Sequence, residues 1–403
     1  MIQGSATLVI DLGNSSTKGK VLFGKDSQSG KFRTREFEIP NVFALIDEDY
    51  EVSSDYSDAT STILKVDTTI NDRPIIGCFC NGLLQMKEKP LCVIKPSATS
   101  KKYDLDSTVL SYRLALLFAY KAIMAMNRTN DYSQLDITWK IVTLLPPGDV
   151  SIGKEPLTNI IKNITSIDAV FPKVSIPVKI SSVTVLPEGY CAYVACVYDV
   201  CHTFRPDYKF LTDEIVIVFD IGAGTTDILV IEGNKLVQNS KYTIEQGGNN
   251  VHKLVKRELR AKGIALSDEA ISEGIINGTV KDGAKVVDIV DIINNANAEV
   301  AQKLVSETQD FFELTDIKAR SIGYVLVCGG GSIKSDVNTN IIPISKKVIE
   351  QFKATLSPNS ELITIPKHLV TKEDAEGSPY SIEEEISPRK LNLIGASILA
   401  EVL

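Results

Sequence analysis

The chain has 403 residues, a length that suggests about two domains at roughly 150 residues each. Its 44% hydrophobic and 23% charged residues are typical of a globular protein and exclude a disordered chain. The net charge of −8 argues against direct, tight binding to nucleic-acid phosphates. Any link to DNA is therefore expected to run through a basic adaptor protein.

Neither a secretion signal nor a membrane span is expected. Met1–Ser5 hold no basic stretch before an apolar run, and the most apolar segment, Leu110–Met126, is interrupted by Arg113 and Lys121. The seven cysteines are odd in number and irregularly spaced, which favours a reducing cytoplasm. Their spacing is not that of a zinc site, so we expect buried thiols in the two groups Cys78, Cys80, Cys92 and Cys191, Cys196, Cys201.

The chain opens with a predicted β-hairpin. Thr7–Ile10 reads as a strand, Asp11–Thr17 as a turn and Lys18–Phe23 as the return strand. Gly and Asn in the turn favour a tight hairpin. Short strands and loops are expected over residues 24–105, with a turn at Asn71–Pro74.

The middle of the chain alternates helices and strands. A long apolar helix is expected over 108–126, capped by Asp106 and Ser107, and a buried strand over Trp139–Leu145. Further along, the patterns predict a helix at Pro156–Asn163, a strand at Val174–Val185, and an apolar helix over 189–202 that opens at Leu186–Gly189.

A second hairpin of the same kind follows. Ile215–Phe219 is the predicted strand, Asp220–Asp227 the turn and Ile228–Ile231 the return strand. A repeat of the hairpin within one chain implies two similar domains that face one another.

Helices dominate the remaining predictions. Gln246–Asn249 precedes an amphipathic helix that ends near Gly263, with Val251, Leu254, Val255 and Leu259 on its apolar face. The other predicted elements are a polar helix over 267–277, a long helix over 288–313, a strand Tyr324–Cys328 running into Gly329–Ser332, an exposed acidic loop over 371–388, and a last helix Leu391–Leu403.

The two turns have the chemistry of phosphate binding. Each strand holds a carboxylate, Asp11 or Asp220, at the start of a turn whose Gly and Ser/Thr residues let backbone N–H groups approach phosphate oxygens. A carboxylate beside phosphate requires a cation between them, which predicts a largely hydrated Mg²⁺. Lys18 is placed to reach a β- or γ-phosphate. One such turn would more often be a hairpin that binds nothing, but two copies and a third strand running into Gly329–Gly331 favour a nucleotide site.

Known phosphate-binding fingerprints do not account for these turns. No GxxxxGK[ST] loop occurs, and Gly222-Ala223-Gly224 is not followed by the spacing of a dinucleotide fingerprint. The pattern instead resembles the actin/Hsp70/sugar-kinase superfamily. The motifs that carry the resemblance are Val9–Asn14 (phosphate-1), Phe219–Asp227 (phosphate-2), Val327–Ser332 (adenosine), and the connecting helices at Pro187–Gly189 and Asn392–Ala396.

The resemblance implies an α/β, actin-like (ribonuclease H-like) fold with two similar domains around a nucleotide cleft. Residues 1–185 plus 391–403 are expected to form domain I, and residues 186–390 domain II. It also implies that Asp11 and Asp220 hold Mg²⁺ largely through water, and that Glu188 and Asp220 orient the attacking water. The implied nucleotide contacts are Gly13, Asn14, Ser15, Ser16, Lys18, Gly222, Gly224, Thr225, Thr226, Gly247, Gly248, Asn249, Glu273, Gly329 and Gly330.

Several of these residues have simpler explanations. Glu188 follows a proline and is also a favourable acid at a helix start, Asp227 is more typical of a structural turn, and Lys18 is compatible with a solvated strand position. His202, His252 and His368 are scattered and suggest no chemistry.

Within the superfamily, the sequence is most similar to the bacterial plasmid-partition actins, the ParM-like and Alp proteins. That resemblance implies a cytoplasmic ATPase that polymerises into dynamic filaments and moves plasmid DNA through an adaptor, without binding nucleic acid or membrane itself. GTP stays an alternative to ATP. A sugar- or acetate-type kinase and a cell-shape or division actin are the rival functions, and an Hsp70-type chaperone would need a peptide-binding domain after the second connecting helix.

Overall fold

The computed structural model describes residues 1–25, 30, 32–47, 62–70, 73–81, 92–94, 101–199, 202–315, 317–332, 338–373 and 379–402. The chain divides into two compact units. Unit 1 comprises Met1–Leu145, Asp149–Pro187 and Leu399–Leu403, and unit 2 comprises Pro146–Gly148 and Glu188–Ile398. The predicted turn at Asn71–Pro74 lies partly outside the described residues.

This division corrects the expected domain boundaries. Residues 391–398 belong to unit 2, whereas the sequence placed the whole segment 391–403 in the first domain. The reason is packing: the helix that contains Gly395 lies against the Cys191 carbonyl of unit 2. The boundary between the units falls at Pro187 rather than at residue 185.

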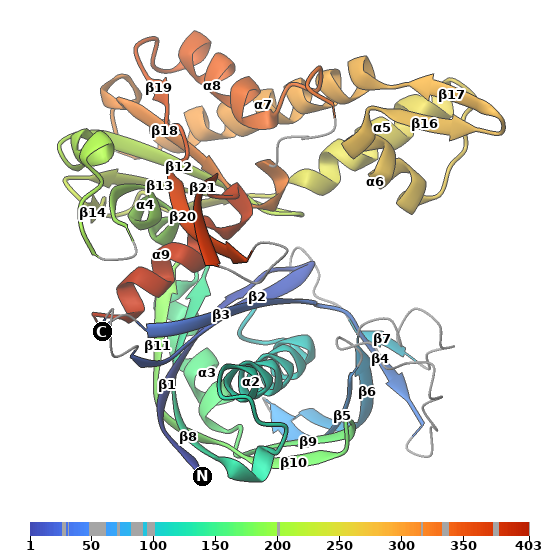
Figure 1. The fold of residues 1–403 in the computed structure, drawn as a ribbon. Coiled ribbons are helices and arrows are strands. Elements are labelled where there is room, and N and C mark those ends of the chain that lie inside the picture. Colours follow the sequence, from blue (N-terminus) through green and yellow to red (C-terminus); the bar gives the residue numbers. More distant parts are fainter. Residues whose placement is uncertain are drawn as a thin grey trace. The chain divides into compact units, whose positions relative to one another are not determined.

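The first hairpin lies in a sheet of unit 1 with the strand order β11-β8-β1-β2-β3 (Figure 1). β1 and β2 pair antiparallel, β8 lies parallel to β1, and β11 lies parallel to β8. The strands β1 and β8 end in buried, largely apolar runs, which is typical of central strands in a sheet covered on both faces. The bounds are β1 Ile2–Leu12, β2 Ser16–Lys25, β3 Phe32–Pro40, β8 Leu135–Leu145 and β11 Lys179–Pro187.

A second sheet completes unit 1, with the order β10-β9-β5-β6-β4-β7. Helix α2 lies between the two sheets, and α3 packs on β8 and β11 (Figure 1). The bounds are β4 Phe43–Ile46, β5 Thr62–Ile70, β6 Arg73–Asn81, β7 Cys92–Ile94, β9 Ser166–Phe171, β10 Val174–Pro177, α2 Asp106–Met126, α3 Val150–Lys162 and the short 3₁₀ turn η2 Tyr132–Gln134.

Helix α2 is the core helix of unit 1. It is long and apolar enough to cross a membrane, yet 78% of its most apolar window is buried inside the protein, as expected for a core helix. The N-terminal cap is Leu105, without a side-chain hydrogen bond, so the predicted capping role of Asp106 and Ser107 is wrong. Both of those residues lie inside the helix, where Ser107 is buried.

The second hairpin lies in the sheet of unit 2, which has the order β14-β13-β12-β18-β19 with β15 paired to β13. This order repeats that of unit 1: an antiparallel hairpin, then two strands parallel to its first strand. The repeat predicted from the sequence is thus a repeat of topology. The bounds are β12 Ile215–Ile221, β13 Thr226–Glu232, β14 Lys235–Leu236, β15 Tyr242–Ile244, β18 Tyr324–Cys328 and β19 Glu361–Leu362.

The helices of unit 2 follow the sequence patterns closely. In α5, Val251, Val255 and Leu259 are buried as predicted. In α6, Ser267 caps the first turn and Gly278 ends the helix in the left-handed conformation. The bounds are α4 Tyr190–Val197, α5 Gly248–Ala261, α6 Asp268–Asn277, α7 Val290–Glu313, α8 Ile344–Thr355, α9 Leu391–Ala400 and the 3₁₀ turns η3 Pro206–Thr212, η4 Ala319–Ser321, η5 Gly330–Ser332 and η6 Pro388–Lys390.

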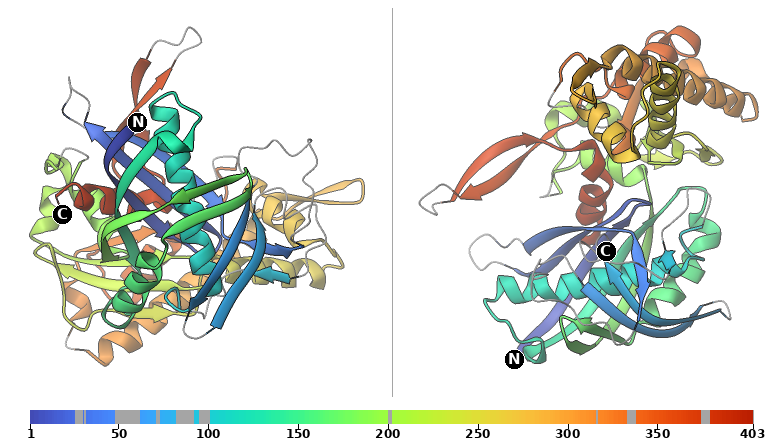
Figure 2. Two further views of the ribbon diagram at one scale, coloured as in Figure 1. Left: turned by 90° about the horizontal axis from the view of Figure 1, so that it is seen from below. Right: turned by 90° about the vertical axis from the view of Figure 1, so that its right-hand side faces the viewer.

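Two further hairpins extend from unit 2. β16 (Thr279–Asp282) pairs with β17 (Lys285–Asp288), and β20 (Lys367–Glu373) pairs with β21 (Pro379–Glu385). Figure 2 shows the β20–β21 hairpin reaching away from the sheet of unit 2. The expected acidic loop over 371–388 is therefore wrong, because much of that segment is paired backbone.

The cysteines within the described residues are small buried groups, as predicted. Cys78, Cys80, Cys191, Cys196 and Cys328 are all buried. Burial raises the pKa of the Cys196 thiol to about 12, so this thiol is inert at neutral pH. The side chain of Cys92 and the whole of Cys201 lie outside the described residues.

Candidate nucleotide site

The first turn places a carboxylate and an ammonium side by side in unit 1. Asp11 and Lys18 are opposite each other across the β1–β2 hairpin, and both are buried. Lys18 Nζ donates to Asp11 Oδ2 at 2.9 Å. Lys18 is therefore not a solvated strand residue: it is held at the turn by Asp11, and its contact with phosphate stays a prediction.

A residue that the sequence did not single out, Asn41, holds this turn in shape. Its Nδ2 donates to the Gly13 carbonyl at 2.7 Å, and its backbone N–H donates to the Ser15 carbonyl at 3.0 Å. Ser111 of α2 in turn donates to Asn41 Oδ1. Asn41 is 1% exposed, so the turn is tied to the core of unit 1 through a buried amide. No local signal marks an asparagine that acts on a turn so far away in sequence.

The first turn leaves backbone donors unused. Gly13 N–H closes the turn on the Ser16 carbonyl at 3.0 Å, whereas the N–H groups of Asn14 and Ser15 donate to no acceptor in the described part of the chain. The Ser16 hydroxyl donates to Glu38 at 2.6 Å. Two adjacent backbone amides that have no acceptor among the described residues, three and four residues after a buried carboxylate, are donors suited to an anion.

The second turn has the same construction in unit 2. Gly222 N–H closes the turn on the Thr225 carbonyl at 2.8 Å, and the N–H groups of Ala223 and Gly224 find no acceptor among the described residues. The Thr226 hydroxyl donates to the Gln246 carbonyl at 2.7 Å, so it serves the fold in this structure. Asp227 accepts from the Thr243 hydroxyl at 2.5 Å, which supports the structural reading of that acid.

The Gly-rich segments of unit 2 converge on the second turn. Gly248 N–H donates to the Gly222 carbonyl at 3.0 Å, and Asn249 N–H donates to the Ala223 carbonyl at 2.7 Å. The start of α5 is thereby fixed to the turn, with Gly247 as its N-cap.

The Gly-rich segment after β18 comes close to the end of β12 at Gly329. Its φ of +87° favours glycine, and a Cβ there would lie 2.4 Å from the Ile221 carbonyl oxygen and 2.5 Å from Asp220 Oδ1. Gly330 lies beside Arg389. Glu273 is exposed on α6, and the described contacts do not bring it to these segments, so its role stays a prediction.

Asn392 links the two predicted catalytic residues of unit 2. Its Nδ2 donates to Asp220 Oδ2 at 2.6 Å, and its Oδ1 accepts from the Gly189 N–H at 2.8 Å, immediately after Glu188. Glu188 and Asp220 are each 7% exposed. One amide side chain on α9 thus fixes both the carboxylate at the end of β12 and the backbone that carries Glu188. The sequence placed Asn392 in a connecting helix without giving it this role.

The chemistry of the donor set fits a hydrated magnesium ion. Among the described residues, no three His, Cys, Asp or Glu side chains gather into a cage. Asp11 pairs with Lys18 and Asp220 accepts from Asn392, and each carboxylate precedes a turn with two backbone amides that have no acceptor among the described residues. Mg²⁺ is usually held in this way, by one or two carboxylates with water and phosphate oxygens completing the shell.

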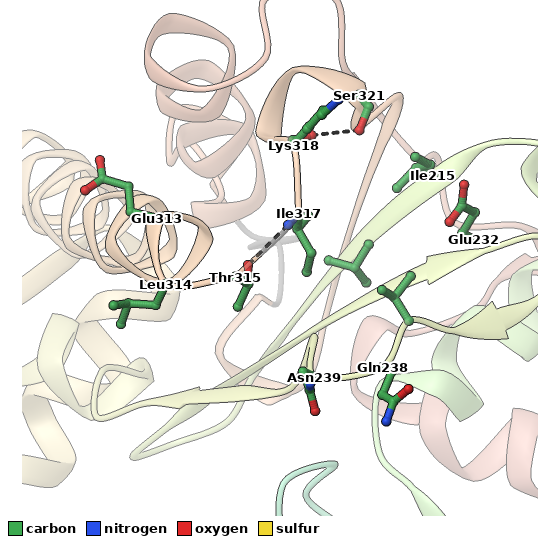
Figure 3. A pocket seen from close by; sticks show the side chains of 12 residues that line it. Ile215, Glu232, Gln238, Asn239, Glu313, Leu314, Thr315, Ile317, Lys318 and Ser321 are labelled. Carbon is green, nitrogen blue, oxygen red and sulfur yellow. Dashed lines mark hydrogen bonds between the residues drawn. The ribbon is translucent and has the colours of Figure 1, made fainter.

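Unit 2 also has a cavity that lies away from these turns. It has a volume of about 500 Å³ and lies where β12 begins, beside the end of α7 (Figure 3). Ile215 lines it, whereas Asp220 lies five residues further along the same strand, roughly 17 Å away at about 3.3 Å per residue. The cavity is therefore not part of the predicted nucleotide site.

Comparisons with known proteins agree with this architecture. Residues 218–338 match the family model of the archaeal actin homologue MreB-like, C-terminal domain. The chain has the actin-like fold: solved structures of that fold superpose over nearly its whole length. A search of curated proteins found no match.

Three of these structures show the range of the likeness. The actin-like protein Alp7A has a TM-score of 0.65 at 13% identity, covering 100% of this chain and 97% of its own. A 15-stranded ParM filament from Clostridium botulinum gives 0.60 at 16% identity, covering 99% of both chains. Bacillus thuringiensis ParM with ATP gives 0.56 at 14%, covering 99% of this chain and 98% of its own. The resemblance to ParM and Alp proteins is thus confirmed at the level of fold.

Proposed function

We propose that this protein binds and hydrolyses ATP and assembles into filaments. The observation that carries the proposal is the paired construction of the two turns. In each unit a buried carboxylate, Asp11 or Asp220, is followed three and four residues later by two backbone amides that have no acceptor among the described residues. That donor set suits a polyphosphate with its metal ion. The solved structure of Bacillus thuringiensis ParM with ATP supports adenine nucleotide as the ligand, and GTP stays an alternative.

Each group then has a role. The amides of Asn14 and Ser15, and those of Ala223 and Gly224, bind phosphate oxygens. Lys18, already beside Asp11, adds a positive charge when phosphate is present. When bound, Mg²⁺ neutralises phosphate charge, and the residues that would hold it are Asp11 and Asp220.

Hydrolysis rests on positioning rather than on covalent chemistry by the protein. Glu188 and Asp220 orient the attacking water, and a buried carboxylate accepts a hydrogen bond from that water strongly because few solvent molecules compete. Asn392 keeps Asp220 from rotating by donating to its Oδ2, and it fixes the backbone after Glu188 at the same time.

Replacing Asn392 with alanine should slow ATP hydrolysis by about 10- to 100-fold, mainly through kcat, because Asp220 and the Gly189 amide both lose their partner. The matched control is Ser397→Ala, on the same helix, whose hydroxyl only donates to the Leu393 carbonyl. Steady-state phosphate release measured over a range of ATP concentrations separates kcat from KM. Equal rates for the two variants would show that Asn392 has no part in positioning.

The fold neighbours support the filament function, and the charge of the chain bears on how it would engage DNA. One superposed structure is itself a ParM filament, which supports assembly of this chain with copies of itself. We further propose that the filaments act in the cytoplasm to segregate plasmid DNA. With a net charge of −8, the chain would engage DNA through a basic adaptor rather than directly.

A pelleting assay tests filament assembly against the rival kinase function. Sedimentation and light scattering with ATP, with ADP and without nucleotide should show polymer above a critical concentration only when nucleotide is present. A kinase would instead transfer phosphate to a sugar or acetate without assembly. Failure to pellet with ATP or GTP at any salt concentration would remove the filament function, and a membrane-dependent pellet would favour a cell-shape or division actin.

A further inference from the structure

The solvent side of α5 is basic, although the chain as a whole carries a net charge of −8. The apolar residues of this helix face the core, and four basic residues share the opposite side at the spacing i, i+3, i+4 and i+7. We call these four the basic face of α5: Lys253, Lys256, Arg257 and Arg260. Like charges three and four positions apart repel on a helix surface, so an anionic surface covering this face would stabilise it.

Only part of this charge is balanced within the described structure. Lys253 and Arg260 are exposed and form no ion pair with any residue that the structure describes. The other two basic residues form the pairs Lys256–Asp268 at 2.5 Å, Arg257–Glu258 at 3.3 Å and Arg257–Glu299 at 3.7 Å. Acids beside the basic face would repel a nucleic-acid backbone, which is a continuous array of phosphates. A protein surface with its own patch of acids is the better match.

The same unit has an acidic face on the last turns of α7. We define it as Glu307, Asp310 and Glu313, which follow one another at intervals of three residues along one side of the helix. Asp310 and Glu313 are exposed. Burial raises the pKa of Glu307, and the charges of Asp310 and Glu245 raise it further, although Lys303 acts in the opposite direction. Negative charge is therefore in local excess on this side of α7.

Apolar side chains lie exposed beside the acidic face. Leu314 is 86% exposed and directly follows Glu313 at the end of α7 (Figure 3). Tyr242 is 39% exposed and stacks on Phe311 of α7, with the ring centroids 5.2 Å apart. Exposed leucine and tyrosine next to charged groups are typical of a surface that binds another protein.

The two faces match in length but do not meet within one copy. The basic face covers Lys253–Arg260 and the acidic face Glu307–Glu313, which are about 10 Å and 9 Å at 1.5 Å per residue. Asp310 lies roughly 16 Å along α7 from Glu299, the acid that reaches Arg257. No ion pair joins the two faces in the described part of the chain. A contact between them therefore requires two copies.

We propose that the basic face of α5 in one copy binds the acidic face of α7 in a second copy. Because the contact joins two different surfaces, each copy binds one neighbour through α5 and another through α7, and the contact continues from copy to copy. The inference rests on the proposed filament function, for which it names one contact between subunits. The paired charges lie at the surface, so association should weaken as salt rises.

Charge reversal tests this contact in full-length protein with ATP. One double variant, Lys253→Glu with Arg260→Glu, reverses the unpaired charges of α5, and the other, Asp310→Lys with Glu313→Lys, reverses the exposed acids of α7. Each variant alone should need a critical concentration for pelleting at least about 10-fold above that of the wild type, because like charges then meet. An equal mixture should assemble again, since each junction then joins two reversed faces or two unchanged ones.

Lys154→Glu with Lys162→Glu is the matched control. Both lysines are exposed on α3, and the change in net charge equals that of the α5 variant, so assembly should be unchanged. Circular dichroism confirms that each variant is folded, and if a double variant unfolds, the single reversals Lys253→Glu and Asp310→Lys replace the doubles in the same mixture. An equal loss of assembly in the control, or a mixture that stays unassembled, would overturn the proposal.

Sedimentation velocity of the mixture separates this contact from the filament function. If the wild type forms no polymer, the filament function fails, and the contact is still decided by whether the two variants form complexes together that neither forms alone. Normal pelleting of both double variants would show that the filament uses other surfaces. Wild-type binding to a labelled DNA duplex that is lost in Lys253→Glu with Arg260→Glu, and is not restored by mixing, would assign the basic face to nucleic acid instead.

Discussion

Replacing Glu188 with alanine is expected to slow phosphate release by about 100-fold or more while nucleotide binding and assembly persist. Glu188 is 7% exposed, immediately before α4, and the next backbone N–H is fixed to Asn392. A buried carboxylate whose following backbone is fixed in that way is suited to orient water in the transition state, and the proposed phosphate contacts are backbone amides of the two turns rather than this side chain. The loss should therefore fall on kcat.

The measurement is single-turnover phosphate release alongside nucleotide affinity and pelleting. Glu232→Ala is the matched control, because Glu232 is an exposed acid of unit 2 at the far end of β13. Unchanged phosphate release in Glu188→Ala would remove Glu188 from the mechanism.

Glu188→Gln separates catalysis from a structural role at the helix start. Glutamine keeps the size of the side chain and most of its hydrogen-bonding capacity, but it is a much poorer acceptor for a water proton. A structural role predicts near-normal hydrolysis in this variant. A catalytic role predicts a rate close to that of the alanine variant.

The elements that the sequence predicted well are those controlled by neighbouring residues. The two hairpins follow from apolar runs that end in Asp-x-Gly, and their registers pair Asp11 with Lys18 and Asp220 with Asp227. Helix α6 begins after Ser267 and ends before Gly278, because each cap satisfies backbone groups within its own turn.

The features that the sequence missed depend on contacts between distant segments. Asn392 and Asp220 are 172 residues apart, and Asn41 reaches the Gly13 carbonyl from 28 residues away. An asparagine carries no pattern that names its partner, since its role is fixed only when the chain packs. The same holds for residues 391–398, whose assignment to unit 2 depends on which helix they contact. The acidic composition near β20 and β21 suggested a loop, but a two-stranded hairpin tolerates exposed charge on both faces.

Gly395→Ala is the second large effect expected, and it acts on stability. A Cβ at this position would lie 1.7 Å from the Cys191 carbonyl oxygen, 2.6 Å from its carbon and 3.1 Å from the Ala195 nitrogen. All three atoms are backbone of α4, so no side-chain rotation relieves the clash, and α9 or α4 must move. We expect a loss on the order of 3 kcal/mol or more in the free energy of unfolding, and a fall in Tm of roughly 10 °C.

The sign of this effect distinguishes packing from helix propensity. Inside a helix, alanine is favoured over glycine by about 1 kcal/mol, so propensity alone predicts a more stable protein. Gly148→Ala supplies the control, because nothing lies within 4 Å of the Cβ it would add. Thermal unfolding of both variants decides whether packing or helix propensity controls the change in stability. Because α9 also carries Asn392, displacement of this helix should separate that amide from Asp220 and lower ATP hydrolysis as well. A raised Tm with normal hydrolysis would show that α9 and α4 do not meet at Gly395.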